Sequence, residues 1–442
     1  MANIDIPTVS SFRFLKNANL ILRNPLPFHR ENFQKLGDIF QVDLGFRKNV
    51  IFCRDAHFAE YVLKKNHKNY HKSTIQTEDM AKYLGHGLLT TDGEQWRKQR
   101  RMVQPAFHKK QLAQLLDSVD AAIKTEIDRV ETGKAMDIFP IFNDLAFQTV
   151  VKSLFSSAAG QEEINILQYI TEAAQKMLVK ELRQPFKGWW FKLSGKIKHH
   201  LELTQEAREI LKKIVAERRQ SGQRQDDLLD MLLDARYEDG EAMSEKQLID
   251  EILILFTAGH ETTSNALTFT TKLLANHPEV QDKISSEVKE ARANSEDHFE
   301  FLKNCTYTSQ VVEESMRLYP PVYFIDRVNL EDDEFNGIHI PKNSSLLFSL
   351  YEIHRNEEHW KNPEEFNPDR FEGGGNKHEP YYFPFGAGPR KCIGNNFAMY
   401  EMIMTVAELV SRFKISAPSA EIEIQPLITL KPKNAIVEFT PR

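Results

Sequence analysis

Residues 385–394 read FGAGPRKCIG, and the fold of the whole chain is inferred from this stretch. It matches the pattern F-x-x-G-x-R-x-C-x-G at every fixed position. If each fixed residue has a frequency of roughly 5%, chance produces the pattern in about one chain of this length in ten thousand. Gly386 and Gly388 allow the backbone to turn tightly and to approach a large flat ligand.

Cys392 stands directly before a segment with helical apolar periodicity. Its recurring apolar positions are Phe397, Ala398, Met402, Ile403, Val406, Leu409 and Val410. The dipole and free amides at a helix N-terminus draw a thiol toward thiolate. A thiolate ligand donates electron density to heme iron and favours O–O cleavage. Phe385 would then pack beside the sulfur, and Arg390 could pair with a heme propionate. The alternative is a buried structural cysteine, the usual state of an isolated thiol.

The stretch resembles the heme-binding loop of the cytochrome P450 family of monooxygenases. The resemblance implies the cytochrome P450 fold, which is mainly α with a small β subdomain. It implies heme b (iron-protoporphyrin IX) as the cofactor and Cys392 as the iron ligand. It also places Ala258, Phe385, Arg390 and Gly394 among the residues that bind the cofactor.

Length and composition are those of an ordinary globular protein, with 442 residues, 41% hydrophobic and 27% charged. We find no internal repeat and no Gly/Ser-rich, Pro-rich or single-charge tract that marks a linker, so we expect one domain over residues 1–442. The net charge of −6 argues against a general nucleic-acid binder. An odd and sparse set of 3 cysteines forms no disulfide framework and suits a reducing compartment.

The N-terminal residues 1–32 mix apolar side chains with charges such as Asp5, Arg13 and Lys16. They contain no run of about 20 apolar residues and no signal-peptide layout. Microsomal members of the resembled family carry such an anchor. The sequence therefore predicts a soluble, cytoplasmic protein of the bacterial type, with no transmembrane segment.

Trp96 and Arg100 are four residues apart and would share one face of a helix. An indole N–H and a guanidinium that face the same way suit two carboxylate oxygens. The alternative is an exposed basic helix with a half-buried tryptophan. The resemblance assigns both residues to the heme propionates and adds Arg327 as a third partner.

A capping box at Ser244 to Gln247 opens an uninterrupted helical pattern that runs to Asn276. Its centre reads AGHETT over residues 258–263, which matches the family motif A-G-x-[D/E]-T-T. Thr262 can bond back to a carbonyl one turn earlier, bulge the helix and open a groove beside Gly259. Glu261 and Thr262 would then deliver protons. The alternative is a glycine packing contact with a solvated Glu261, and we interpret His260 as structural.

Glu314 and Arg317 match the family's E-x-x-R pair, and Arg370 lies where the family has a further arginine. We expect a buried charge cluster that holds the loop carrying Cys392 and takes no part in catalysis.

Other stretches give local predictions. Residues 39–44 and 50–53 alternate like strands around a turn at Gly45-Phe46-Arg47, and residues 66–93 are expected to form a long loop. Residues 186–191 belong either to a lid over the substrate channel or to ordinary packing, and residues 422–440 resemble short strands. Polar residues in the 72–95 loop, together with Asp326, favour a polar or oxygenated substrate.

The resemblance implies a heme-thiolate monooxygenase that activates O2 and hydroxylates or oxidatively O-dealkylates a small organic substrate. We expect no fused flavin or ferredoxin domain. The resemblance therefore implies electrons from NAD(P)H through a ferredoxin or flavodoxin and its reductase. A basic patch of Arg97, Lys98, Arg101 and Lys391 would suit an acidic partner. Three alternatives remain: a peroxygenase driven by hydrogen peroxide, a non-catalytic heme gas sensor, and a scaffold that has lost its heme.

Overall fold

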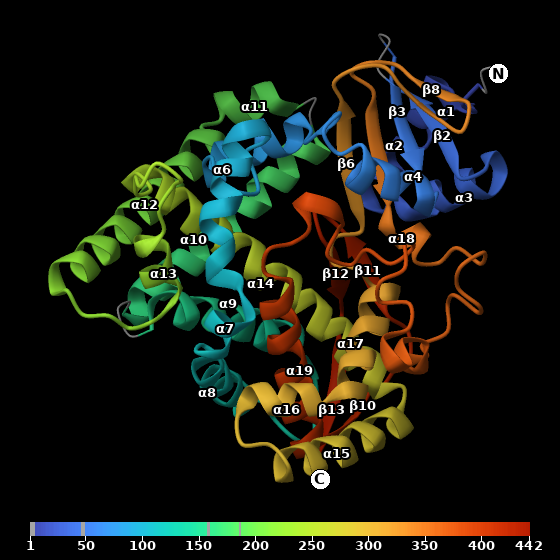
Figure 1. Ribbon diagram of the computed structural model, residues 1–442. Coiled ribbons are helices and arrows are strands. Elements are labelled where there is room, and N and C mark those ends of the chain that lie inside the picture. Colours follow the sequence, from blue (N-terminus) through green and yellow to red (C-terminus); the bar gives the residue numbers. More distant parts are fainter. Residues whose placement is uncertain (1–4, 46–48, 157–159, 185–186) are drawn as a thin grey trace.

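The computed structural model describes residues 5–45, 49–156, 160–184 and 187–442. Helices make up most of the molecule, and a smaller β region lies at one end beside the N-terminal helices (Figure 1). This is the mainly α architecture with a small β part that the sequence predicted.

Helices occur along the whole of the described chain. In the first half they are α1 (Ser11–Lys16), α2 (Ala18–Arg23), α3 (Leu26–Leu36), α4 (Ala56–Glu60), the π-helices η1 (Tyr61–Lys65) and η2 (Ile75–Met80), α5 (Ala81–Leu84), α6 (Gly93–Val103), the 3-10 helix η3 (Gln104–Phe107), α7 (Lys109–Ala113), α8 (Leu116–Ile127), α9 (Phe139–Phe155), α10 (Gln161–Arg183), α11 (Gly188–Leu193) and α12 (Lys196–Ser221). The second half contains α13 (Leu228–Asp234), α14 (Glu245–Ala275), α15 (Pro278–Ala293), α16 (His298–Asn304), α17 (Thr306–Leu318), α18 (Leu350–Ile353), the 3-10 helices η5 (Pro368–Gly374) and η6 (Gly388–Arg390), and α19 (Asn395–Arg412).

The strands form one larger sheet and several small ones. Their bounds are β1 (Thr8–Val9), β2 (Ile39–Asp43), β3 (Asn49–Cys53), β4 (Tyr70–His71), β5 (Ala135–Asp137), β6 (Phe324–Asn329), β7 (Asp333–Phe335), β8 (Ile338–Ile340), β9 (Ser345–Ser349), β10 (Phe413–Ser416), β11 (Glu423–Pro426), β12 (Leu430–Lys433) and β13 (Ile436–Pro441). The larger sheet has the order β1-β2-β3-β9-β6-β4, so strands from both halves of the chain lie side by side in it.

The predicted hairpin is confirmed, because β2 and β3 pair antiparallel with Ile39 opposite Cys53. Residues 46–48 at its turn lie outside the described residues. The predicted long loop over 66–93 is wrong in part. The segment contains β4, η2 and α5. Met80 at the end of η2 and Tyr83 and Leu84 of α5 are buried against α10, α11 and α14. The predicted C-terminal strands are confirmed as β11, β12 and β13.

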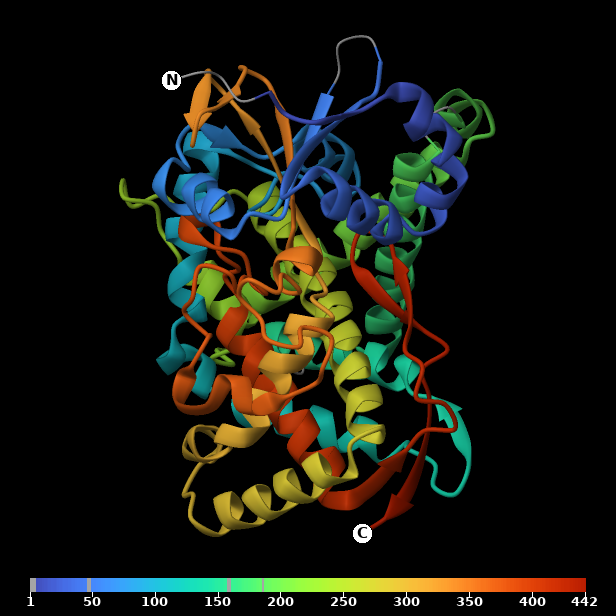
Figure 2. The same cartoon turned by 90° about the vertical axis from the view of Figure 1, so that its right-hand side faces the viewer.

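Helix α14 crosses the middle of the molecule, as both views show (Figures 1 and 2). The Ser244 side chain accepts a hydrogen bond from Gln247 N, and Asn276 caps the other end, so the predicted bounds are confirmed. The capping box is only half formed, because the Gln247 side chain donates to Glu251 and to the His86 carbonyl. At 1.5 Å per residue the helix is about 46 Å long. Residues along this helix therefore keep fixed positions relative to one another in the interior of the molecule.

Candidate heme-thiolate site

The loop over 385–394 is held by its own backbone and by a neighbouring helix. Cys392 N donates to Phe385 O at 2.9 Å, which closes the loop before α19 begins. Gly388 has a φ of +69°, and a Cβ there would lie 2.0 Å from the Leu63 carbonyl oxygen of η1. This glycine is therefore required by backbone packing against η1, in addition to its left-handed conformation.

Cys392 differs from the other cysteines in its surroundings. Its side chain is accessible although protein surrounds it densely, whereas Cys53 and Cys305 are buried. Burial raises the pKa of the Cys392 thiol, and the Gly394 amide, Arg100 and Lys391 act in the opposite direction. These neighbours therefore do not by themselves produce the thiolate that the helix position predicted. A coordinated metal ion would supply the missing positive charge and deprotonate the thiol.

Trp96 and Arg390, predicted as propionate partners, lie against each other. The Arg390 guanidinium carbon is 5.2 Å from the centre of the Trp96 ring. Arg390 pairs with Asp92 and donates to the carbonyls of His67 and Tyr70. Its Nε is buried without a hydrogen-bond partner among the described residues. The side chain therefore keeps one donor free for a further acceptor.

Arg327 and Arg100 complete the predicted set. Burial and the nearby charge of Arg390 lower the pKa of Arg327 to about 10, and its guanidinium donates to the Asp326 carbonyl. Arg100 donates to the Lys391 carbonyl at 2.9 Å and interacts electrostatically with Cys392. It therefore ties α6, the helix that carries Trp96, to the cysteine loop.

The donor chemistry of this cluster fits the heme that the resemblance implies. Arg327 and Arg390 repel each other, and Arg390 has an orphaned Nε. A ligand with two carboxylates would compensate the buried positive charge and accept the free hydrogen bonds. The accessible sulfur of Cys392 lies close enough to Arg100 to share the same site.

Sequence reasoning missed two residues of this region. Asp92 caps α6 and pairs with Arg390, and its position just before the helix of Trp96 was a readable N-cap signal. Lys72 is partly buried and donates to the carbonyls of Leu88, Leu89 and Thr91. Desolvation of the ammonium group lowers its pKa to about 7. We find no sequence pattern that indicates the role of Lys72.

The centre of α14 departs from expectation. Thr262 Oγ1 donates to the Ala258 carbonyl at 2.8 Å, as predicted. The helix nevertheless continues without a π segment, so the expected bulge is absent from α14. A Cβ on Gly259 would lie 2.9 Å from Val150 Cγ2 of α9, so the expected groove is filled there and the packing alternative holds for this glycine. Ala258 has an exposed side chain although it lies in the middle of α14.

Glu261 and Thr262 face different neighbours. Glu261 Oε1 accepts from Thr429 Oγ1 at 2.9 Å, and the same hydroxyl accepts from Asn265 Nδ2. Thr429 lies in the turn between β11 and β12. The carboxylate is thus held by a distant turn, a contact that sequence reasoning missed.

His260 is structural, as predicted. It is buried, its Nδ1 is 2.7 Å from the Phe256 carbonyl oxygen, and its ring meets Phe147 edge to face. Burial lowers its pKa.

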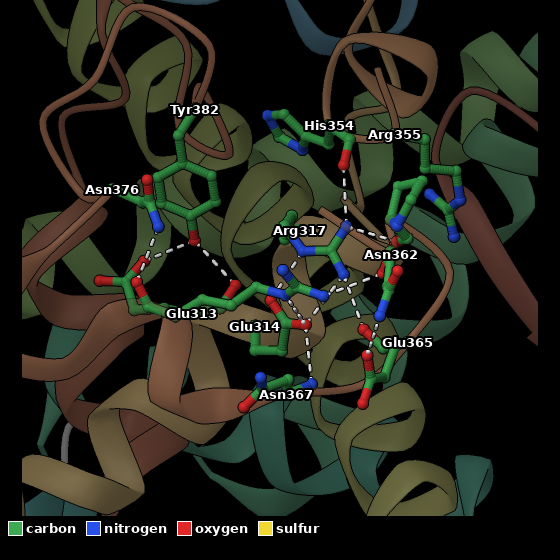
Figure 3. Close-up of polar contacts among 12 residues, drawn as sticks. Glu313, Glu314, Arg317, His354, Arg355, Asn362, Glu365, Asn367, Asn376 and Tyr382 are labelled. Atoms are coloured by element: carbon green, nitrogen blue, oxygen red, sulfur yellow. Dashed lines mark hydrogen bonds and ion pairs between the residues drawn. The ribbon is translucent and has the colours of Figure 1, made fainter. Parts of the chain in front are cut away.

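The predicted cluster of Glu314, Arg317 and Arg370 is formed. Glu314 and Arg317 are buried (Figure 3), whereas Arg370 is partly buried. Arg317 binds both carboxylate oxygens of Glu314, at 2.7 and 2.8 Å, and donates to three backbone carbonyls. Arg370 Nε donates to Glu314 at 3.3 Å. One of the carbonyls belongs to His354, whose Nε2 accepts from Phe383 N just before the cysteine loop. The cluster therefore anchors the segment that leads to Cys392.

Two weaker expectations change. Asp326 accepts a hydrogen bond from Ser73, so its carboxylate is engaged and no longer supports a polar substrate. In the expected lid, Phe186 lies outside the described residues, while Trp189 and Trp190 are exposed and Phe191 is buried.

Within the described ranges no helix is long and apolar enough to cross a membrane, and no three His, Cys, Asp or Glu residues are placed to hold a metal ion.

A basic cleft of about 380 Å³ lies beside the cysteine loop. Phe385, Gly386, Met399 and Tyr400 contribute to its lining. Four lysines also line it: Lys109, Lys303, Lys377 and Lys391. Glu313 also lines the cleft and pairs with Lys377 at 2.9 Å, so Lys109, Lys303 and Lys391 carry its uncompensated positive charge. In the predicted basic patch, Arg97 and Arg101 form exposed ion pairs with Glu94 and Glu238.

The chain belongs to the cytochrome P450 family, because the family's sequence model matches residues 10–439. Cyclooctat-9-en-7-ol 5-monooxygenase of Streptomyces melanosporofaciens is 30% identical over 409 residues, covering 92% of this chain and 88% of that protein. Pentalenene oxygenase of Streptomyces avermitilis is 24% identical and covers 96% of this chain and 94% of its own. Among solved structures, the retinoic acid-bound cyanobacterial CYP120A1 matches with a TM-score of 0.83, 25% identity and 100% coverage of both chains. The heme domain of cytochrome P450DA matches with a TM-score of 0.86 and 22% identity, covering 100% of this chain and 98% of its own.

Proposed function

We propose that this P450 is a heme-thiolate monooxygenase that inserts one oxygen atom of O2 into a C–H bond of a small organic substrate, by hydroxylation or oxidative O-dealkylation. The observation that carries the proposal is the accessible Cys392 thiol beside Arg100 of α6, the same helix whose Trp96 packs against Arg390. When bound, heme would supply the O2 and electron chemistry.

Each residue has a defined task in this proposal. Cys392 would bind the iron, and the Gly394 amide would donate to its sulfur, which stabilises the thiolate. Trp96, Arg100, Arg327 and Arg390 would hold the propionates. Phe385 would exclude water from the sulfur. Ala258 would leave room for the cofactor because its side chain is a single methyl group.

Proton delivery is assigned to Thr262 and Glu261. The Thr262 hydroxyl is engaged with the Ala258 carbonyl, so it has a lone pair free to accept a hydrogen bond from a ligand. Glu261 keeps one oxygen beyond its bond with Thr429. We propose that water joins the two side chains, because they leave α14 in different directions.

The substrate is proposed to be mostly apolar. Ala258, one turn before Thr262 on α14, is exposed and presents only a methyl group, and Val322, before β6, is 40% exposed. The names of the relatives refer to cyclooctat-9-en-7-ol, pentalenene and retinoic acid. A library of such compounds, screened for the Soret shift that accompanies loss of iron-bound water, identifies the substrate class.

Electrons are proposed to come from NAD(P)H through a separate acidic ferredoxin or flavodoxin and its reductase. Charge complementarity with the basic cleft beside Cys392 supports this part of the proposal.

The decisive experiment replaces the iron ligand. Cys392→Ser is expected to abolish the strongly red-shifted Soret band of the reduced carbonyl complex, since that band requires thiolate ligation. Cys305→Ser, which changes a cysteine buried away from the site, should keep it. If the band persists in Cys392→Ser, the assignment of Cys392 as the iron ligand is wrong.

Turnover with NAD(P)H and partner proteins, compared with turnover on hydrogen peroxide, separates a monooxygenase from a peroxygenase. A substrate-induced spin-state change separates both from a gas sensor.

A further inference from the structure

The basic cleft beside the cysteine loop has an apolar floor, made by Phe299 and Leu302 of α16 and by Tyr400 and Ile403 of α19. The Phe299 and Tyr400 rings meet edge to face, with their centroids 6.1 Å apart. Leu302 and Ile403 are buried behind them. Figure 1 shows α16 beside α19, and the two helices are in contact. The floor is therefore a preformed surface of aromatic and aliphatic side chains, which suits a flat ring.

Three lysines stand around this floor without an anionic partner. Lys109 of α7, Lys303 of α16 and Lys391 of the cysteine loop are exposed, and none of them forms an ion pair within the part of the chain that the structure describes. Lys303 Nζ lies 4.6 Å from the centre of the Phe299 ring, so one charge is held directly at the edge of the floor. A hollow lined by charges of one sign concentrates the field and attracts small ions of the opposite sign.

The acid in the cleft cannot balance these lysines. Glu313 of α17 is the only acidic residue among the described residues that line it. One of its carboxylate oxygens pairs with Lys377 at 2.9 Å, and the other accepts a hydrogen bond from the Tyr382 hydroxyl at 2.6 Å. Both oxygens are thus engaged. The charge of Lys109, Lys303 and Lys391 is left for a solute to match.

The size of the cleft points to a small molecule. Its volume of about 380 Å³ lies within the range of about 300–1,000 Å³ that is usual for small-molecule sites. The flat face of a folded protein cannot fill such a hollow. A phosphate monoester carries a charge between about −1.5 and −2 at neutral pH, and lysine ammonium groups bind phosphate as point charges. A ring on the floor and a phosphate among the lysines would satisfy both parts of the cleft.

We propose that this cleft binds a small aromatic phosphate. The ring lies against Phe299 and Tyr400, and the phosphate contacts Lys109, Lys303 and Lys391. Binding at this site does not depend on the reaction at the heme. A bound phosphate also cancels the charge that would attract an acidic redox protein, so the ligand restricts the supply of electrons. This second step rests on the proposed function.

The site is tested by calorimetric titration of the purified holoprotein with 1-naphthyl phosphate and, separately, with inorganic phosphate. We expect one site for 1-naphthyl phosphate, with an affinity at least about tenfold higher than that for inorganic phosphate, because the naphthyl ring buries apolar surface on the floor. High salt should weaken the binding, since exposed lysines act through screened charges. The proposal is overturned if 1-naphthyl phosphate does not bind or if inorganic phosphate binds equally well.

A double variant locates the ligand. Lys109→Met combined with Lys303→Met removes two cations but keeps the apolar stems, and it should lower the affinity for 1-naphthyl phosphate roughly tenfold without changing the melting temperature. Lys342→Met combined with Lys414→Met is the matched control. Those lysines are also exposed and make no ion pair among the described residues, and they lie outside the cleft. Equal affinities for the two double variants would place the ligand elsewhere and overturn the site.

The second step has its own measurement. Saturating 1-naphthyl phosphate should slow reduction of the heme iron by an acidic ferredoxin roughly tenfold at low salt, and it should leave reduction by dithionite unchanged, because dithionite needs no protein docking. If 1-naphthyl phosphate binds in the calorimeter but reduction by the ferredoxin keeps its rate, the restriction of electron supply is overturned while the binding site stands. The two parts of the proposal can therefore fail separately.

Discussion

The Thr429 hydroxyl, in the turn between β11 and β12, donates to Glu261 Oε1 at 2.9 Å and accepts from Asn265. A residue proposed to supply protons is thus oriented by a turn that is remote in sequence. The hydrogen bond to Thr429 holds the Glu261 carboxylate in one orientation, which differs from that of the Thr262 hydroxyl bonded to the Ala258 carbonyl.

Thr429→Val should impair proton delivery while leaving the fold intact, because valine has nearly the shape of threonine but cannot donate. We expect the ratio of product formed to NAD(P)H consumed to fall about fivefold, the size expected for one lost hydrogen bond. Thr268→Val is the control, since that hydroxyl donates to the Ser264 carbonyl of its own helix. Equal coupling ratios for the two variants would contradict the role given to Thr429.

Arg317→Met should destabilise the protein strongly. Arg317 and Glu314 are fully buried, so the change removes the cation that binds both oxygens of a core carboxylate and leaves only Arg370, at 3.3 Å, to compensate it. We expect a loss of about 3–5 kcal/mol in the free energy of unfolding, measured by denaturant titration. Arg224→Met removes an exposed ion pair with Asp234 and should cost less than about 1 kcal/mol. Similar losses for the two variants would show that the buried cluster is not an anchor.

Glu401→Gln should stabilise the protein at alkaline pH. Glu401 of α19 is fully buried, accepts from Thr149 and has a second oxygen without a partner among the described residues. Burial raises the pKa of Glu401 from 4.5 to about 8. The folded state therefore binds more protons than the unfolded state between these values, and wild-type stability falls as pH rises through that window.

The stability of the glutamine variant does not depend on pH through residue 401, because an amide does not titrate. Its advantage over wild type should be nearly absent near pH 4.5 and reach the order of 4 kcal/mol near pH 8. Unfolding midpoints at the two pH values measure the difference, and Glu423→Gln, a change at a partly exposed strand position, serves as the control. An advantage that is the same at both pH values would show that Glu401 does not titrate in the folded protein.

Lys109→Glu combined with Lys391→Glu should slow electron transfer from an acidic partner. Both lysines line the cleft beside Cys392, and reversing them replaces attraction by repulsion. We expect a drop of roughly tenfold in the bimolecular reduction rate at low salt and a weaker dependence on ionic strength. Lys342→Glu, at an exposed position in the β region, should change neither quantity. Unchanged reduction rates in the double variant would exclude this docking surface.

Local patterns predicted the fold well where each element carries its own signal. The bounds of α14 follow from Ser244, from the apolar periodicity and from Asn276, and all three act within a few residues. The cluster of Glu314 and Arg317 was predictable because its spacing on one helix brings the two side chains together.

Contacts between distant segments could not be predicted in the same way. Asp92 and Arg390 belong to different halves of the chain, and only the folded backbone brings them together. Gly259 is a second contact between distant segments that the sequence did not predict. The sequence motif suggested space beside this glycine, whereas Val150 of α9 fills that space. The partner of a small residue depends on helix packing, which composition does not specify.

The contact of Gly388 with the Leu63 carbonyl has a consequence for the order of assembly. Residue 63 leaves the ribosome long before residue 388, yet the segment around Cys392 takes its shape only against the earlier helix. The apoprotein must therefore bring together segments from both halves of the polypeptide before a porphyrin can be captured. We therefore expect a chain that ends before the cysteine loop to bind no porphyrin and to remain colourless.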